Sequence, residues 1–192
     1  DDVSGLIIGE PTSNIAYYAH KGSMSCVVTA KGKAAHSSMP HLGTNAVDIL
    51  VDFVNEMKQE YKNIKEHDKV HELDAVPMIE KHLHRKIGEE ESHIYSGFVM
   101  LNSVFNGGKQ VNSVPHKATA KYNVRTVPEY DSTFVKDLFE KVIRHVGEDY
   151  LTVDIPSSHD PVASDRDNPL IQNITRIAPN YVHEDIVVSA LI

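Results

Sequence analysis

Two segments in which apolar and polar residues alternate constrain the fold of this chain more than any other feature. They span residues 23–30 and 118–126, and each places small or branched apolar side chains on one face and polar side chains on the other. Alternation with a period of two is typical of a β-strand with one buried face. Apolar residues at 98–105 and 151–155 predict two further strands. The chain therefore carries at least four strands of a sheet with one polar face.

Two amphipathic helices separate these strands. Apolar residues recur at helical spacing from Ala46 to about Tyr61, with Thr44 or Asn45 as the predicted N-cap. A second such segment begins at a cap formed by Asp131 or Ser132 and stops at Gly147. The resulting order β-α-β-β-α-β is that of a ferredoxin-like sandwich, an α+β fold. In this fold both helices cover one face of a four-stranded antiparallel sheet, and the polar face stays open.

Composition and charge narrow the classes of function. Of the 192 residues, 41% are hydrophobic and 24% are charged, which is ordinary for a globular protein in water. No apolar run approaches the ~20 residues of a membrane span, and no segment resembles a signal or transit peptide. The single cysteine, Cys26, alternates with apolar strand residues and fits a reducing compartment, so we expect a cytoplasmic protein. A net charge of −8 argues against nucleic acid as a partner.

The segments outside the sandwich have a different character. The apolar run Leu6–Ile8 predicts a strand buried on both faces, and it ends at Glu10, at the edge where α/β sheets place ligands. Near the other end, Asn168 caps a helix that begins at Pro169, and a strand follows at 186–189. The polar stretch 62–96 predicts a solvated insertion. Within it, His82 and His84 would share one face of a strand, but no third metal ligand stands at a suitable spacing.

Several short motifs carry chemically versatile residues in a fixed order. They are GEPT at 9–12, GKAAHSSMP at 32–40, NSVP at 112–115 and NVR at 123–125. Together they resemble the M20 family of metallopeptidases and deacylases, most of all its succinyl-diaminopimelate desuccinylase-like members from Gram-positive bacteria. The resemblance implies a lid, or dimerisation, domain at 19–158, with 62–96 as an insertion. It also implies that 1–18 and 159–192 are pieces of an α/β zinc-binding catalytic domain.

The same resemblance implies roles for individual residues. Glu10 corresponds to a ligand of one of two zinc ions, which cobalt or manganese could replace. His36 corresponds to a lid histidine that stabilises the oxyanion in the partner subunit's active site. Asn112 and Arg125 correspond to substrate contacts, and a planar guanidinium is suited to clamping a carboxylate. Lys21 stands where the family often places a basic residue, although many desuccinylases carry arginine there.

The activity implied by the resemblance is hydrolysis of N-succinyl-LL-2,6-diaminopimelate to succinate and diaminopimelate. The partners expected are this small anionic amide and a second copy of the chain, bound through the helix that begins at Ala46 and an edge strand. Other zinc-binding motifs of the family are absent, so we expect a fragment that is inactive by itself. Two alternatives remain open. The parent protein could be an M20 aminoacylase or di/tripeptidase, or the chain could be a non-catalytic ferredoxin-like dimerisation module.

Overall fold

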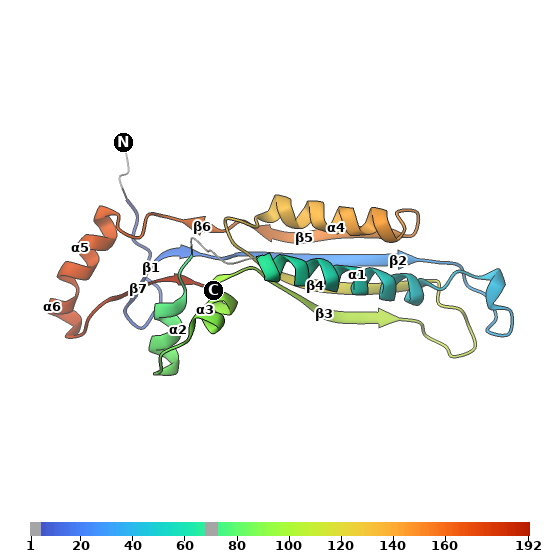
Figure 1. The fold of residues 1–192 in the computed structure, drawn as a ribbon, viewed down its shortest axis with the longest axis horizontal. Helices are drawn as coiled ribbons and strands as arrows, with labels where there is room; N and C mark the ends of the chain where they lie inside the picture. The colour runs from blue at the N-terminus through green and yellow to red at the C-terminus, as the bar shows by residue number, and fades with distance from the viewer. Residues whose placement is uncertain (1–4, 68–72) are drawn as a thin grey trace.

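The computed structural model describes residues 5–67 and 73–192. Its larger part is a four-stranded antiparallel sheet with the strand order β3-β4-β2-β5 (Figure 1). The strands are β2 (Gly22–Lys31), β3 (Val99–Gly107), β4 (Lys117–Thr126) and β5 (Leu151–His159). With the two intervening helices, this order is the predicted ferredoxin-like arrangement. The predicted α+β class is therefore confirmed.

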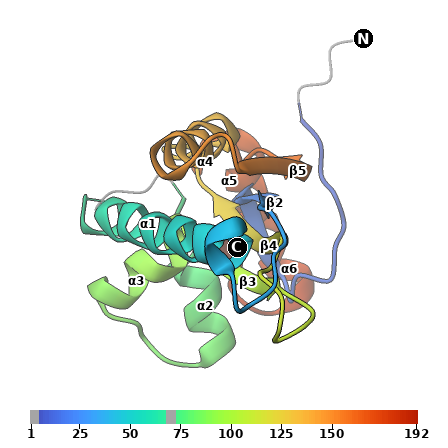
Figure 2. The ribbon, with the colours of Figure 1, turned by 90° about the vertical axis from the view of Figure 1, so that its right-hand side faces the viewer.

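Two long helices, α1 (Ala46–His67) and α4 (Ser132–Val146), lie side by side on one face of this sheet (Figure 2). The alternation seen in the sequence explains why they cover only one face. In β2, the side chains of Met24, Cys26 and Val28 are at most 2% exposed and point towards the helices. Between sheet and helices, the ring of Phe53 lies 6.3 Å from that of Tyr122, edge to face. Burial of these apolar side chains is the main force that holds the layers together.

Side chains at the helix starts act as the predicted caps. The Asn45 carboxamide oxygen accepts a hydrogen bond of 3.0 Å from the backbone N–H of Val47 at the start of α1. The Asp131 carboxylate accepts one of 2.9 Å from the backbone N–H of Phe134, and α4 stops before Gly147, which has a φ of 159°. Such contacts satisfy N–H groups that have no partner within the helix. The sequence thus places the start of α1 and both ends of α4 correctly.

The smaller part of the molecule joins the two ends of the chain. Strand β1 (Ile15–His20) pairs in parallel with β7 (Val187–Leu191) and antiparallel with β6 (Val162–Ala163). Between β6 and β7 lie α5 (Pro169–Ile177), capped by Asn168 as predicted, and the short α6 (Pro179–Val182). Strand β1 was not anticipated, although it forms the centre of this second sheet and leads directly into β2. Residues from both ends of the chain therefore belong to the same small sheet.

The stretch predicted to be a solvated insertion, 62–96, is partly folded into this unit, and the prediction is corrected accordingly. After the end of α1 it forms α2 (Val76–Leu83) and α3 (Glu89–Ser96), and α2 packs against β7. Leu73, Ala75 and Ile79 are buried, and the packing of α2 against β7 accounts for the burial of Ile79. Residues 68–72 of this stretch lie outside the described residues.

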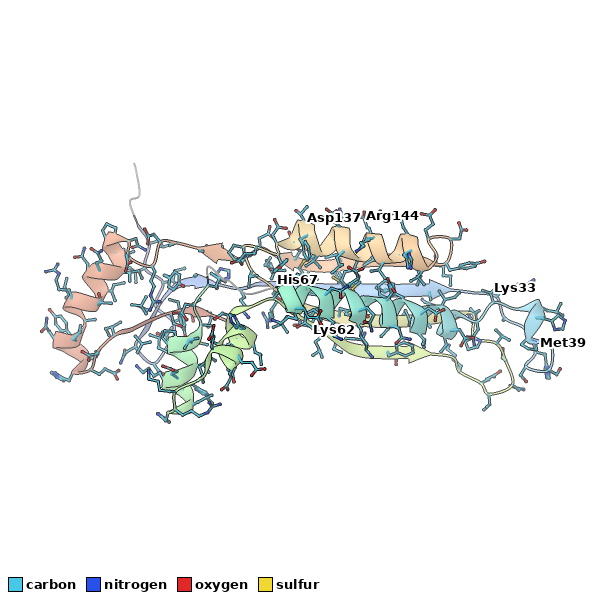
Figure 3. All side chains as sticks on the ribbon, in the orientation of Figure 1. Lys33, Met39, Lys62, His67, Asp137 and Arg144 are labelled. Carbon is cyan, nitrogen blue, oxygen red and sulfur yellow. The ribbon has the colours of Figure 1, made fainter. Side chains whose placement is uncertain are left out.

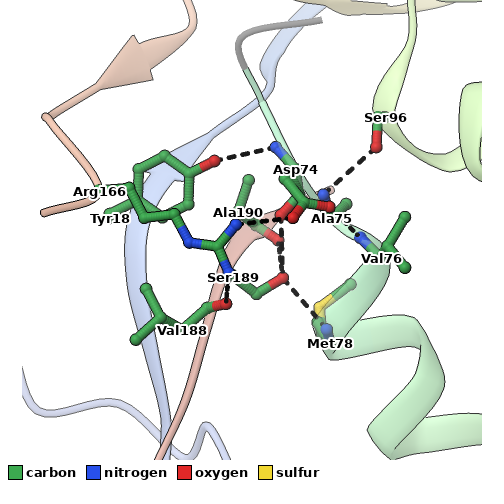
Figure 4. Close-up of polar contacts among 10 residues, drawn as sticks. All are labelled: Tyr18, Asp74, Ala75, Val76, Met78, Ser96, Arg166, Val188, Ser189 and Ala190. Atoms are coloured by element: carbon green, nitrogen blue, oxygen red, sulfur yellow. Dashed lines mark hydrogen bonds and ion pairs between the residues drawn. The ribbon is translucent and has the colours of Figure 1, made fainter. Parts of the chain in front are cut away.

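A network of polar contacts around Asp74 fastens this segment to the small sheet (Figure 4). The Asp74 carboxylate lies 2.8 Å from the Arg166 guanidinium, and the Tyr18 hydroxyl accepts a hydrogen bond of 2.9 Å from the Asp74 backbone N–H. The Asp74 carbonyl accepts hydrogen bonds from the backbone N–H of Ala190 and the hydroxyl of Ser189. Four separate parts of the chain meet here, so no local sequence pattern could have predicted the contact.

One further local prediction is wrong, and one arrangement that the sequence pattern did not favour does not form. Leu6, Ile7 and Ile8 form no strand and are 64–73% exposed, because no described residue supplies the neighbouring strands that would bury both faces. His82 and His84 do not share a strand face either. His82 lies in the last turn of α2, and His84 follows it in a left-handed conformation with a φ of 53°.

None of the helices in the described ranges combines the length and the apolar character needed to cross a membrane.

Candidate functional site

Two loops meet at the end of the large sheet that lies farthest from α5 and carry two of the predicted site residues. Figure 3 marks this end, the tip, by Lys33 and Met39. The first loop leaves β2, forms the short 3-10 helix η1 (Pro40–Leu42) and enters α1; the second joins β3 to β4. The backbone N–H of Ser37 donates to the carbonyl of Asn112 at 3.1 Å, and that of Val114 donates to Ala35 at 2.8 Å. The structure therefore brings the motifs at 32–40 and 112–115 together.

His36 is exposed at this tip, and its ring is held by a residue two positions later. The backbone N–H of Ser38 donates to Nδ1 of His36 at 3.2 Å, and the Ser38 hydroxyl oxygen lies 2.8 Å from the same nitrogen. Because a backbone N–H can only donate, Nδ1 accepts, and the neutral imidazole carries its proton on Nε2. The loop thus presents an N–H donor of the kind that an oxyanion requires. Ser38, which contacts this ring, is not among the predicted site residues, although its position two residues after a histidine is the signal.

Asn112 lies beside His36 with its carboxamide exposed. Its backbone carbonyl is engaged by Ser37, and the isolated bridge between His36 and Ser113 fixes the spacing of the two loops. A carboxamide offers both a donor and an acceptor. Together, Asn112 and His36 form a pair of polar groups that could bind a carbonyl oxygen on another molecule. Their exposure means that they line no enclosed pocket within the described part of this chain.

Arg125 occupies the other end of β4, on the open face of the sheet. It is exposed, and it pairs in register with Ser23 of β2 and with Val99 of β3. Within the described residues, the guanidinium has no hydrogen bond or ion pair, so its five N–H donors are available to a ligand. Alternation places it on the polar face, as predicted.

Lys21 has a different environment from Arg125. Its side chain is only 7% exposed, and the ammonium donates a hydrogen bond of 2.6 Å to the carbonyl oxygen of Gly97. Its backbone N–H donates to Leu191 of the small sheet. Lys21 thus ties the junction of β1 and β2 to the start of β3. The structure shows this anchoring contact and gives no direct support to the predicted substrate role.

The predicted substrate-contacting residues lie at the two ends of the large sheet and cannot meet within one chain. Arg125 lies eight residues along β4 from Lys117, which is next to the tip. At ~3.4 Å per residue, this separation is about 27 Å, far longer than any side chain. The side chain of Arg125 therefore cannot reach His36 or Asn112 within one chain. The action of His36 in trans stays a prediction.

Glu10 is the predicted metal ligand, and it lies apart from both groups. It is exposed in the extended segment that precedes β1. Within the ranges 5–67 and 73–192, no three His, Cys, Asp or Glu side chains lie close enough to hold a metal ion. The described residues therefore do not form a zinc site by themselves. Glu10 could supply one ligand at most.

Comparison with known proteins gives this geometry a context. The model of the peptidase M20 dimerisation domain matches residues 18–151. The chain belongs to this family. The match covers the large sheet up to the first residue of β5, both of its helices and the segment with α2 and α3. The family is one of metal-dependent hydrolases, and the matched domain is described as one of dimerisation.

Curated relatives match over most or all of the chain. It is 51% identical over 193 aligned residues to a probable succinyl-diaminopimelate desuccinylase of Staphylococcus aureus strain Mu50, covering 100% of this chain and 48% of the relative. An acetylornithine deacetylase of Vibrio cholerae is 27% identical over 177 residues, covering 89% of this chain and 41% of that protein. The chain thus spans about half the length of the curated relatives that it matches.

Solved structures share the fold at low identity. The M20 family metallo-carboxypeptidase Sso-CP2 of Sulfolobus solfataricus superposes with a TM-score of 0.63 at 18% identity, covering 91% of this chain and 45% of that one. The di-peptidase Dug1p of Saccharomyces cerevisiae superposes with a TM-score of 0.61 at 14% identity, covering 93% and 44%. At these identities the likeness concerns the fold alone.

Proposed function

We propose that this chain is the lid and dimerisation part of an amidohydrolase that releases succinate from N-succinyl-LL-2,6-diaminopimelate. The observation that carries the proposal is 51% identity, over the whole chain, to a probable succinyl-diaminopimelate desuccinylase, against 27% to an acetylornithine deacetylase. The higher sequence identity, over the full length of the chain, to the relative named for the succinylated substrate supports that substrate class. Residues up to about 18 and from 159 onwards would belong to the zinc-binding catalytic domain, into which the lid is inserted.

In this proposal the chain's own residues have three tasks. The Nε2–H of His36 and the carboxamide of Asn112 would donate to the substrate's carbonyl oxygen as negative charge develops there in the partner's active site. Arg125 would hold the substrate's carboxylate from the chain that owns that active site. Glu10 would contribute one ligand to the zinc pair, and the remaining ligands would come from other parts of the protein. The substrate role of Lys21 stays a prediction.

A homodimer follows from this division of tasks. Two copies would pair through α1 and an edge strand of the large sheet, so that the tip of each lid reaches the other chain's active site. Strands β3 and β5 are the two edges of that sheet, and exposed edges readily pair with another strand.

The alternative of a non-catalytic dimerisation module gives no reason for an unpaired Arg125 and an Nε2–H donor on His36. An aminoacylase or peptidase would use the same lid residues, so substrate assays must separate these activities.

The test uses the full-length protein, loaded with zinc, and measures succinate release from N-succinyl-diaminopimelate. We expect robust release by the wild type and a decrease in kcat of about 100-fold or more in His36→Ala, because one oxyanion donor is lost. Cleavage of N-acetyl amino acids or dipeptides in place of the succinylated substrate would contradict the proposal and favour the alternative. Activity in His36→Ala equal to that of the wild type would refute the role of His36.

Complementation tests the action in trans. His36→Ala and Arg125→Gln chains, each inactive alone, are co-expressed with different affinity tags. In a mixed dimer one site receives both substitutions and the other receives neither, so co-expression restores up to about a quarter of wild-type activity. If both residues served the same chain's site, every site would lack one group, and no activity would return.

A further inference from the structure

The acidic residues of this chain are distributed very unevenly. All 27 Asp and Glu lie outside the ranges 11–47 and 97–128, although these ranges hold seven of the 19 Lys and Arg. The two ranges contain β2, β3, β4 and both loops of the tip. In a chain with a net charge of −8, β2 and β4 therefore carry Lys and Arg, and none of the three strands carries a carboxylate. Such a distribution produces a local field that attracts anions.

The register of the sheet arranges part of this surface into a row of polar side chains. His159, at the end of β5, pairs with Ser23 of β2, and Ser23 pairs with Arg125 of β4. Directly paired residues point to the same face, and Ser23 alternates with buried Met24, so all three side chains lie on the open face. The next row repeats the polar character with Ser157, Ser25 and Asn123.

We propose that this row is an anion site in which His159 and Arg125 hold one carboxylate between them, across Ser23. The proposal deepens the function proposed above, because it names the residue that recognises the acid group of the acyl chain. His159 was not among the predicted site residues. His159 is 34 positions after Arg125 in the sequence, and only the pairing of β5 with β2 brings the two residues into one row.

The dimensions of the row suit a carboxylate. Neighbouring strands are ~4.8 Å apart, so the backbones of Arg125 and His159 are about 10 Å apart, with Ser23 between them. An arginine side chain extends ~6–7 Å and a histidine ~4–5 Å from the backbone, so their N–H groups can converge on one small anion. His159 is exposed, and in the described residues it makes no side-chain hydrogen bond or ion pair. Its ring is therefore available to donate.

The surroundings of the row favour a carboxylate carried on a short aliphatic chain. On the far side of Arg125, the same face continues with Val99 and with Leu101, which is 58% exposed. Such apolar side chains can contact methylene groups next to the carboxylate. Of the two carboxylates of β5 and its end, one lies far along the strand and the other has a partner on α4. Asp154 lies five residues away along the strand, at ~16 Å, and Asp160 accepts a hydrogen bond of 3.1 Å from the backbone N–H of Ser132.

Direct binding to the 192-residue chain provides the first test. Succinate is titrated into the wild type, His159→Ala, Arg125→Gln and the control His145→Ala, with the imidazole proton resonances and the backbone amides followed by NMR. His145 is an exposed histidine on α4, away from the open face. We expect the His159 resonances to shift with succinate but not with neutral succinamide. Loss of a hydrogen bond to a charged group should raise Kd about tenfold in His159→Ala and leave it unchanged in His145→Ala.

The binding result can overturn the inference in two ways. Equal Kd values for wild type and His159→Ala would show that His159 makes no contact with the anion. Equal shifts with succinate and succinamide would show that the row does not recognise charge. Because all three substituted residues are exposed, the variants should fold, and circular dichroism confirms this before titration.

Kinetics of the full-length protein separate this inference from the proposed function. If the protein is a desuccinylase, His159→Ala should raise KM for the succinylated substrate about tenfold and leave kcat within about twofold, because a binding contact is lost. Desuccinylase activity with an unchanged KM would refute the inference alone. Failure to cleave any succinylated amide, with succinate still bound through His159, would refute the proposed function and leave the anion site standing.

Discussion

Gly32 is a position where a single methyl group should destabilise the tip of the domain. The end of β2 passes so close to the start of α1 that a Cβ on Gly32 would lie 2.1 Å from the carbonyl oxygen of Thr44 and 3.0 Å from the backbone nitrogen of Ala46. Both neighbours are backbone atoms, which cannot rotate away as a side chain does. Gly32→Ala must therefore displace the loop that carries His36 from the first turn of α1.

The size of the effect follows from the contacts that hold this crossing. Lys33 and Thr44 exchange two backbone hydrogen bonds of 2.9 Å each, and Ala46 is fully buried and donates to Pro115 at 2.9 Å. Loss of two or three such bonds costs about 1.5–4 kcal/mol. Alanine also restricts the unfolded chain, which stabilises the protein by about 0.4–1 kcal/mol. We expect a net decrease of about 1–3 kcal/mol in the free energy of unfolding.

Urea unfolding followed by circular dichroism measures this decrease, with Gly9→Ala as the matched control. A Cβ on Gly9 would have no atom within 4 Å, so the control should unfold within about 0.5 kcal/mol of the wild type. Equal midpoints for the two variants would refute the reasoning, because they would show that the crossing of β2 and α1 relaxes without loss of its hydrogen bonds.

Two further predictions concern the core. The Tyr122 hydroxyl is buried, which raises its pKa, and it has no hydrogen-bond partner in the described part of the chain. Tyr122→Phe keeps the ring contact with Phe139 at 5.2 Å and should raise the free energy of unfolding by about 1 kcal/mol; a decrease in urea unfolding would contradict this. Burial raises the pKa of the Cys26 thiol from 9.0 to about 11, so above pH ~9 the unfolded chain loses a proton that the folded chain keeps. The contribution of the buried thiol to the free energy of unfolding should therefore be fully present below pH ~9 and should decrease as the pH rises towards ~11. At pH ~10.5 the wild type should have lost about 2 kcal/mol more than Cys26→Ala. Parallel pH profiles of the two proteins would rule this out.

Much of the large sheet and its helices could be predicted because their signals are local. Alternation specifies which side chains of β2 and β4 face the helices, since a one-residue slip would expose the whole buried set. The caps at Asn45, Asp131 and Asn168 work over three or four residues, so the sequence is sufficient to identify them. Strand order followed from the β-α-β-β-α-β pattern, because short connections leave few arrangements for such a chain.

The errors share a physical origin in long-range contacts. Leu6–Ile8 has the composition of a doubly buried strand, but burial depends on neighbours that a local pattern does not contain. The segment after α1 is rich in charge, yet Ile79 is buried because β7, more than 100 residues later, lies against α2. The Asp74 network likewise depends on Arg166 and Ser189. No window of a few residues includes both sides of these contacts.

By itself, the sequence determined the sandwich and the two helices and supplied the residues that we predict to carry chemistry, because periodicity, caps and short motifs act over a few neighbouring residues. Only the tertiary structure decided how these residues are grouped. It placed His36 beside Asn112, buried Lys21 against Gly97, and set Arg125 about 27 Å from the tip. It also brought His159 into the row of Arg125. These groupings depend on strand pairing and register between distant segments, and pairing is a property of the folded chain.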